Sequence, residues 1–191
     1  MVILPFTEST APHILTQAEC DRLRTACSDS LRDRAIVEVL LQTGIKLSEL
    51  TRLTVDDIEL GRKQTGFMRI RSSRGKKERL IPLNTKVTIA LIDYLNKRKV
   101  ETSKTVFLNR FGEALGERGV QKMLREYLQQ AAIGNASIST LRHTFGTQHI
   151  AKGTSLKTVQ EVMGLKDVRS TSIYQTLAKE IISRELQENS L

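Results

Sequence analysis

Apolar residues recur at helical spacing along most of the chain, beginning near position 16. The segment Thr16–Glu19 has the form of a capping box, in which a threonine and a glutamate three residues later satisfy free N–H groups at a helix start. It predicts a helix that runs to about Cys27. A second helix is predicted from about Ser30, and Gly44 supplies the left-handed residue that ends it.

The pattern changes between positions 67 and 83, where residues that favour β-structure form two short runs. Phe67–Arg71 and Glu78–Leu83 are separated by Ser72–Lys77, a segment that is rich in serine, glycine and basic residues. This arrangement predicts a β-hairpin with a positively charged turn. The hairpin is the one sheet that the sequence predicts clearly.

Helical spacing returns after position 85 and continues to the end of the chain. A short extended piece is expected at Val106–Leu108. A last amphipathic helix is expected at Ala178–Leu191, with Ile181, Ile182 and Leu186 on its apolar side. The other predicted helices, separated by glycines and polar residues, are Ser48–Leu53, Thr85–Lys97, Gly119–Ala132, Ser139–Lys152, Ser155–Met163 and Ser170–Leu177. The chain is therefore expected to be mainly α with a small antiparallel β-sheet, an α+β fold.

Length and composition narrow the class of protein. A chain of 191 residues is long enough for one globular domain with a full core. Its content of 39% hydrophobic and 4% aromatic residues suits a mainly helical, folded domain. No apolar run approaches the roughly 18 residues that cross a bilayer, so we expect no membrane partner and a cytoplasmic location.

The net charge points to an anionic partner. The chain has 30 Lys and Arg residues against 21 Asp and Glu residues, which gives a net charge of +9. Eight basic residues and one acidic residue lie between Arg62 and Arg79, so this region carries +7 of that charge. A solvated surface turn explains such a run as well as a nucleic-acid contact does. Nucleic acid is nevertheless the commonest partner of a basic domain, and double-stranded DNA is the partner we expect.

Candidate metal ligands are sparse. Cys20 and Cys27 lie seven residues apart in one predicted helix, which is the spacing of neither a zinc site nor a disulfide framework. The histidines, His13, His143 and His149, stand at no ligand spacing to these cysteines. We therefore predict packing cysteines, no metal and no small-molecule cofactor.

Four segments, taken in order, resemble the signatures of the tyrosine recombinase (phage integrase) family. Thr43–Leu50 resembles its first signature, and the hairpin Arg74–Leu83 resembles its lysine-bearing hairpin. Ser139–Phe145 resembles its His-x-x-Arg signature. Met163–Leu165 followed by Tyr174 resembles the segment that carries the nucleophilic tyrosine. The order and spacing of all four segments together make the resemblance specific.

The resemblance implies the DNA breaking and rejoining fold of that family, and its metal-free chemistry. Guanidinium groups hold the oxygens of the attacked phosphate, a tyrosine attacks and keeps the 3′ phosphate as an ester, and a lysine protonates the leaving 5′ oxygen. Arg142 stands at the position of the family's second arginine, and Tyr174 stands at that of the nucleophile. Both residue types are intact.

Four other catalytic positions are altered. Lys46 replaces the first arginine and keeps the charge without the bidentate fork. Arg74 replaces the hairpin lysine, and its high pKa suits it poorly to donating a proton, a role left to a neighbouring lysine of the hairpin. Ser139 replaces a histidine and keeps a hydroxyl donor. Leu165 replaces a histidine or a tryptophan and keeps no donor.

The residues expected to contact DNA are Arg74, Lys76, Lys77, Arg79 and His143. A second interpretation stays open for two of the site residues. Lys46 lies beside a helix end and is equally explained by balancing the carbonyl groups there. A structural role explains His143, because the histidine position of the family signature is Ser139.

Three functions fit the sequence. The first is a site-specific recombinase or integrase that breaks and rejoins DNA through a 3′-phosphotyrosine intermediate, with a partly degenerate active site. The second is a catalytically inactive DNA-binding relative, and the third is a type IB-like topoisomerase. Recombinases of this family assemble several subunits on DNA, which implies self-association as a tetramer through the C-terminal helix.

The expected organisation has three parts. They are a lead-in segment at residues 1–15, a catalytic-type domain at 16–177 and a C-terminal docking helix at 178–191. Members of the family usually carry a further N-terminal helical domain that clamps DNA. The short lead-in is therefore expected to reflect either an excised domain or a minimal protein.

Overall fold

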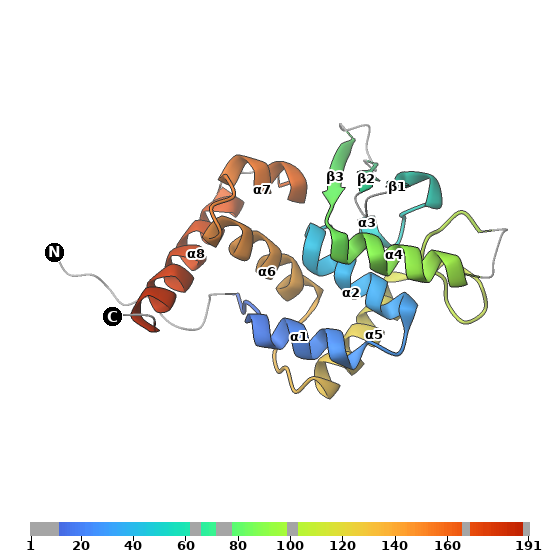
Figure 1. Ribbon diagram of the computed structural model, residues 1–191, viewed down its shortest axis with the longest axis horizontal. Coiled ribbons are helices and arrows are strands. Elements are labelled where there is room, and N and C mark those ends of the chain that lie inside the picture. Colours follow the sequence, from blue (N-terminus) through green and yellow to red (C-terminus); the bar gives the residue numbers. More distant parts are fainter. Residues whose placement is uncertain (1–11, 62–65, 72–77, 99–102, 166–168, 189–191) are drawn as a thin grey trace.

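The computed structural model describes residues 12–61, 66–71, 78–98, 103–165 and 169–188. Within these ranges the chain is mainly helical and has one small antiparallel sheet, as predicted (Figure 1). The elements are α1 (Gln17–Ala26), α2 (Leu31–Thr43), α3 (Leu47–Leu50), the 3-10 helix η1 (Val55–Asp57), β1 (Ile58–Leu60), β2 (Gly66–Ile70), β3 (Arg79–Leu83), α4 (Thr85–Lys97), α5 (Glu117–Gln130), α6 (Ile138–Ala151), α7 (Leu156–Met163) and α8 (Arg169–Glu188). No helix in the described part of the chain is long and apolar enough to cross a bilayer.

Local capping chemistry sets where the first helices begin and end. Thr16 forms the predicted capping box with Glu19: the Thr16 backbone N–H donates to Glu19 Oε2 at 2.8 Å, and the Glu19 backbone N–H donates to Thr16 Oγ1 at 3.2 Å. Ser30 caps α2 through its side chain, and Gly44 ends that helix with a φ of +59°. The predicted starts of α1 and α2 are therefore confirmed to within a residue.

The three strands form a sheet in the order β1-β2-β3. β2 and β3 pair antiparallel from Gly66 opposite Leu83 to Ile70 opposite Arg79, which confirms the predicted hairpin. The sequence did not predict β1, because three residues are too few to show an alternating pattern. The piece expected to be extended at Val106–Leu108 forms an isolated bridge from Leu108 to Ala114, follows a second bridge at Thr105, and buries its apolar side chains.

The core has two parts. The larger one lies between α1, α2, α4, α5, α6 and the inner face of the sheet, and it includes the free, buried Cys20 and Cys27. The expected packing role of these cysteines is therefore confirmed. The smaller part joins α6, α7 and α8 through Phe145, Met163 and Tyr174, together with Val159. This second cluster places the last three helices against one another.

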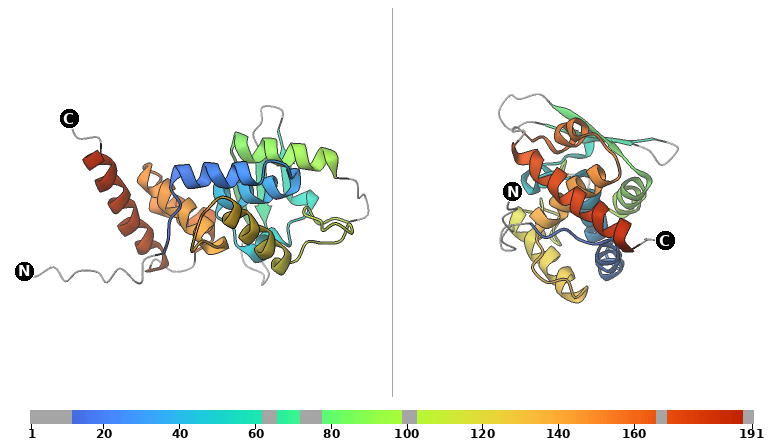
Figure 2. Two further views of the ribbon diagram at one scale, coloured as in Figure 1. Left: turned by 90° about the horizontal axis from the view of Figure 1, so that it is seen from below. Right: turned by 90° about the vertical axis from the view of Figure 1, so that its left-hand side faces the viewer.

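The C-terminal helix corrects one prediction. We expected a helix to Leu177 and a separate docking helix from Ala178, but α8 is continuous across both residues. Leu177 and Ala178 are both buried, and α8 packs along α6, so no solvated break separates the two segments. Beyond them α8 extends away from the helical body (Figures 1 and 2). Ile182 is 39% exposed and Leu186 is 70% exposed, so the apolar side of this end is open.

Candidate functional site

Arg142 lies at the junction of three helices. It projects from α6, and its guanidinium Nη2 donates to the carbonyl oxygen of Met163 at 2.8 Å while Nη1 donates to that of Gly44. These carbonyl groups belong to the last turns of α7 and α2, where unsatisfied oxygens carry partial negative charge. Burial lowers the pKa of Arg142, although a guanidinium remains charged at neutral pH. Arg142 is thus a desolvated cation that protein carbonyls hold in place.

Lys46 lies next to this junction. It follows Gly44 by two residues, its side chain is exposed, and it occupies the N-cap position of α3. Its backbone N–H donates to Glu49 Oε2 at 2.8 Å. Burial alone would raise the pKa of the Glu49 carboxyl, but hydrogen bonds from Arg79 and from the Lys46 backbone lower it below its usual value. An ionised carboxylate therefore sits between Lys46, Arg79 and Arg142.

The Tyr174 side chain packs against α6. Its residue is only 2% exposed, and its ring centroid is 5.6 Å from that of His143. The ring lies over Gly146, because a Cβ on that glycine would come within 3.0 Å of Tyr174 Cδ1 and Cε1. Burial raises the pKa of Tyr174 and the charge of Arg142 opposes this shift, so the phenol is protonated at neutral pH. The only tyrosine of the family-like motif thus lies beside the Arg142 helix.

Two further altered positions, Leu165 and Ser139, lie near Arg142. Leu165 follows the left-handed Gly164 and packs on the cluster that contains Tyr174, so the position without a donor adjoins that cluster. Ser139 is exposed near the start of α6, one helical turn before Arg142, and both therefore share one side of the helix. The structure brings Lys46, Arg142, Leu165 and Tyr174 around one junction.

The residues expected to contact DNA are placed differently from one another. Arg74, Lys76 and Lys77 lie outside the described residues. Arg79 turns inward, where its guanidinium forks onto Glu49. His143 is half-buried beside Tyr174, and burial with the charge of Arg142 lowers its pKa. Its Nδ1 is buried without a hydrogen-bond partner in the described part of the chain.

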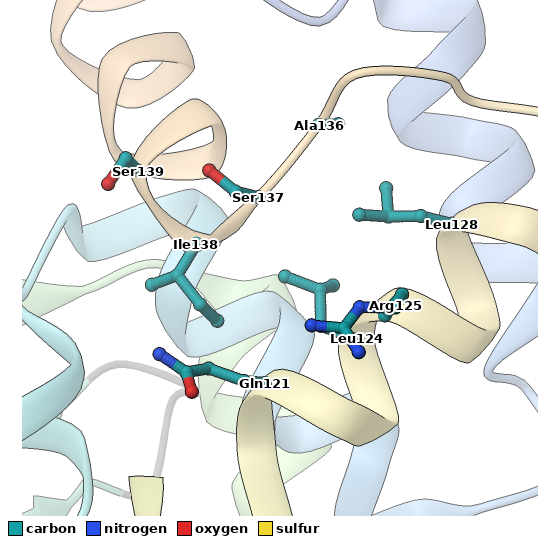
Figure 3. Close-up of a pocket in the computed structure, with 8 residues that line it drawn as sticks. All are labelled: Gln121, Leu124, Arg125, Leu128, Ala136, Ser137, Ile138 and Ser139. Atoms are coloured by element: carbon teal, nitrogen blue, oxygen red, sulfur yellow. The ribbon is translucent and has the colours of Figure 1, made fainter. Parts of the chain in front are cut away.

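An open pocket of about 310 Å³ adjoins Ser139. Figure 3 shows it between α5 and the first turn of α6, with Ser139 at one end and Leu128 at the other. Gln121 and Arg125 of α5 face Ser137 and Ile138 across the opening. The exposed Ser139 hydroxyl is therefore reachable from solvent, unlike the ring of Tyr174.

Metal ligands do not gather at this site. In the described ranges no group of three or more His, Cys, Asp and Glu side chains is arranged to hold a metal ion. The charges that meet at the junction are instead the guanidinium groups of Arg142 and Arg79 and the Glu49 carboxylate, with the exposed Lys46 at the N-cap of the adjoining α3. This set can bind and stabilise a phosphate anion.

Sequence reasoning missed three residues of this junction. Gly44 offers its carbonyl to Arg142, Gly146 makes room for Tyr174, and Glu49 links Lys46 to Arg79. The spacing from Lys46 to Glu49 is that of an N-cap and the third helical residue, a signal that could have identified Glu49. No local pattern marks Gly146, because its neighbour lies on another helix.

Comparison with known proteins agrees with this geometry. Residues 13–180 match the model described as the Phage integrase family. The chain belongs to the phage integrase family. The chain is 33% identical to tyrosine recombinase XerC of Natranaerobius thermophilus over 187 residues, which cover 91% of this chain and 61% of that protein. It is 35% identical to tyrosine recombinase XerD of Staphylococcus haemolyticus over 158 residues, which cover 80% and 52% of the two chains. It therefore spans less than two thirds of the length of these family members.

Solved structures of recombinases share the phage integrase fold seen here. The XerA recombinase matches with a TM-score of 0.82 and 26% identity, over 96% of this chain and 66% of that one. The XerH site-specific recombinase, bound to palindromic difH substrate in a post-cleavage complex, matches with a TM-score of 0.79, over 97% and 55%. Its 22% identity supports the fold alone. The expected tyrosine recombinase catalytic-domain fold is confirmed.

Proposed function

We propose that this chain is the catalytic part of a site-specific DNA recombinase that cleaves strands with Tyr174. The observation that carries the proposal is that Tyr174 lies close to Arg142, and that Arg142 binds the carbonyl of Gly44, two residues before Lys46, although these residues come from distant segments of the chain. Metal-free attack on a phosphodiester needs an oriented nucleophile and cations that stabilise the charge developing on the phosphate oxygens.

The chemistry assigns a role to each group. Tyr174 Oη attacks the phosphorus, its proton passes to water, and the bond from phosphorus to the 5′ oxygen breaks. Arg142 exchanges the carbonyl groups of Gly44 and Met163 for phosphate oxygens, which accept a charged donor more strongly. Lys46 contributes a point charge. The leaving oxygen takes a proton from a hairpin lysine, Lys76 or Lys77, and a second 5′ hydroxyl later reverses the steps.

The burial of Tyr174 supports a resting state of the free protein, in which the nucleophile is held away from DNA. Because only 2% of the Tyr174 residue is exposed and α8 packs along α6, we propose that α8 shifts on α6 before Tyr174 attacks a DNA phosphate. The end of α8 beyond Ala178 presents Ile182 and Leu186 to solvent, and we propose that a neighbouring subunit covers them on DNA, in a tetramer. Assembly would then favour the shifted position of α8.

The altered positions predict slow cleavage. Loss of one donor that stabilises charge in a transition state typically costs about a hundredfold to a thousandfold in rate. Such losses are not additive, so the loss of rate caused by Lys46 and Leu165 together is not the product of their separate effects. These replacements are also the observation that favours the second candidate, an inactive DNA-binding relative. A type IB-like topoisomerase would share the cleavage step and lack exchange of partner strands.

Covalent capture of DNA tests the proposal. The probe is a duplex selected from a random pool by binding to the Tyr174→Phe variant, then nicked so that a cleaved strand diffuses away. The unaltered chain should form a metal-independent covalent adduct on it. Tyr174→Phe should bind the same DNA and form none, because the nucleophile is gone.

Two further variants sharpen the result. Lys46→Arg combined with Leu165→His should raise the rate of adduct formation, because a guanidinium fork and a donor return. Tyr127→Phe is a matched control, since the Tyr127 hydroxyl donates to Asp33 at 3.0 Å in another part of the core. If neither the unaltered chain nor the repaired variant gives an adduct, the inactive DNA-binding function replaces the recombinase. An adduct that survives Tyr174→Phe would show that another residue is the nucleophile.

A further inference from the structure

Arg79 links β3, which carries it, to α3 and α7. From β3, its Nη1 and Nη2 donate to Glu49 Oε1 at 2.9 Å and to Oε2 at 2.7 Å. Its Nε donates to the carbonyl oxygen of Val162, at the end of α7, at 2.8 Å. The side chains of Arg79 and Glu49 are only 21% and 17% exposed, so solvent screens this pair less than a surface pair. The Nε, Nη1 and Nη2 atoms of the guanidinium therefore all donate to protein acceptors.

Gly164 makes room for this guanidinium. It ends α7 in the left-handed conformation, with a φ of +63°. A Cβ at this position would lie 2.9 Å from Arg79 Nη1 and 3.0 Å from Cζ. Arg79 therefore packs directly on the backbone that leads from α7 to Leu165. Its position depends on the end of α7, and the end of α7 depends on it.

Arg79 and Arg142 hold successive carbonyl groups of the same helix end. Arg79 takes the carbonyl of Val162, and Arg142 takes that of Met163. The two cations are close enough that the charge of Arg79 lowers the pKa of Arg142, whereas the charge of Glu49 raises it. Glu49 is therefore the counter-ion of both arginines, but its oxygens are bound by Arg79 and by the Lys46 backbone.

We propose that Arg79 is a positioning residue of the active site. It binds the Glu49 carboxylate and fixes the end of α7, so that Arg142 and Lys46 stay available to a DNA phosphate. The proposal rests on the proposed function, and it replaces the expectation that Arg79 itself contacts DNA. Without Arg79, the half-buried Glu49 carboxylate would have no bidentate partner and would attract Arg142 or Lys46. The same loss would loosen the turn that leads from α7 to Leu165.

The first test separates rate from affinity. With saturating selected DNA, Arg79→Gln should slow adduct formation by about tenfold to a hundredfold, the scale expected when a reacting group is displaced by about an ångström. The dissociation constant of the DNA should rise by much less than the rate falls, and its salt slope should change by less than about one unit, because only one of several phosphate contacts is weakened. Arg79→Lys should form the adduct faster than Arg79→Gln. The double variant Arg79→Gln with Glu49→Gln should also form it faster than Arg79→Gln alone.

Arg24→Gln is the matched control. Arg24 also joins two elements through a glutamate, Glu38, with Nε to Oε1 at 2.7 Å and its side chain 18% exposed, but the pair joins α1 to α2. It should lower the thermal midpoint as Arg79→Gln does and leave the saturating rate unchanged. If both variants slow adduct formation equally, Arg79 acts only through stability and the proposal is wrong. Should Arg79→Gln fail to fold, Arg79→Lys and the double variant decide the same question.

A second readout needs no cleavage. In the Tyr174→Phe background, each central phosphate of the selected duplex is replaced in turn by a neutral methylphosphonate. One position should weaken binding markedly when Arg79 is present, and Arg79→Gln should reduce that preference several-fold. An unchanged preference and an unchanged rate would overturn the proposal for Arg79. Absence of any adduct with the unaltered chain would overturn the proposed function instead, and the methylphosphonate preference would still judge Arg79.

Discussion

Replacement of Gly44 by alanine is a sharp test of how the Arg142 junction is built. Gly44 ends α2 at a φ of +59°, a conformation in which a residue with a Cβ is strained by about 1–2 kcal/mol. The new Cβ would also lie 2.4 Å from Cδ1 of Phe145 on α6, far inside normal contact. Overpacking of this kind typically costs about 1–3 kcal/mol. Gly44→Ala should therefore destabilise the protein by roughly 2–5 kcal/mol.

Gly153→Ala supplies the comparison. Gly153 follows the end of α6 with a φ of +89°, and no atom lies within 4 Å of the position its Cβ would take. This variant should show the backbone cost alone, about 1–2 kcal/mol. Urea unfolding measures both free energies, and thermal unfolding should show a larger fall in midpoint for Gly44→Ala, at about 2–4 °C per kcal/mol for a domain of this size.

Equal destabilisation by the two substitutions would refute the reasoning. It would mean that Phe145 moves aside at no cost and that α6 does not press on the end of α2. A further consequence follows from the hydrogen bond between Arg142 and the Gly44 carbonyl. Gly44→Ala should also slow adduct formation at saturating DNA, whereas Gly153→Ala should not.

Three other predictions concern charge and assembly. Glu49 has a lowered pKa, so its stabilising effect is complete above the pKa of about 4.3 in the unfolded chain and is lost as the pH falls through the folded value. The unfolding free energy of the unaltered protein should therefore fall more between about pH 5 and pH 3 than that of Glu49→Gln, and parallel curves would contradict this. Lys76→Ala with Lys77→Ala should weaken DNA binding and flatten its salt dependence by about one to two units of slope; an unchanged slope would remove both from the interface. Ile182→Ser with Leu186→Ser should leave the thermal midpoint unchanged and reduce assembly on DNA in sedimentation, and normal assembly would show that this end of α8 is not the docking surface.

The sequence determined the elements whose signals are local. Thr16 and Glu19 lie three residues apart, so their reciprocal hydrogen bonds form within one turn and can be inferred from the residue types alone. The same holds for the left-handed Gly44 at the end of α2 and for the pairing of β2 with β3. The family-like order of segments also predicted Arg142 and Tyr174 as site residues.

Only the tertiary structure decided how these residues are used. Arg79 belongs to a basic run that predicted a DNA contact, yet its acceptors are Glu49 and Val162, which are 30 and 83 residues away in the sequence. The storage of Tyr174 over Gly146 and the continuity of α8 past Leu177 depend in the same way on packing between helices. Burial, counter-ions and carbonyl partners are set by the neighbours that folding brings together, and no pattern along a single segment records them.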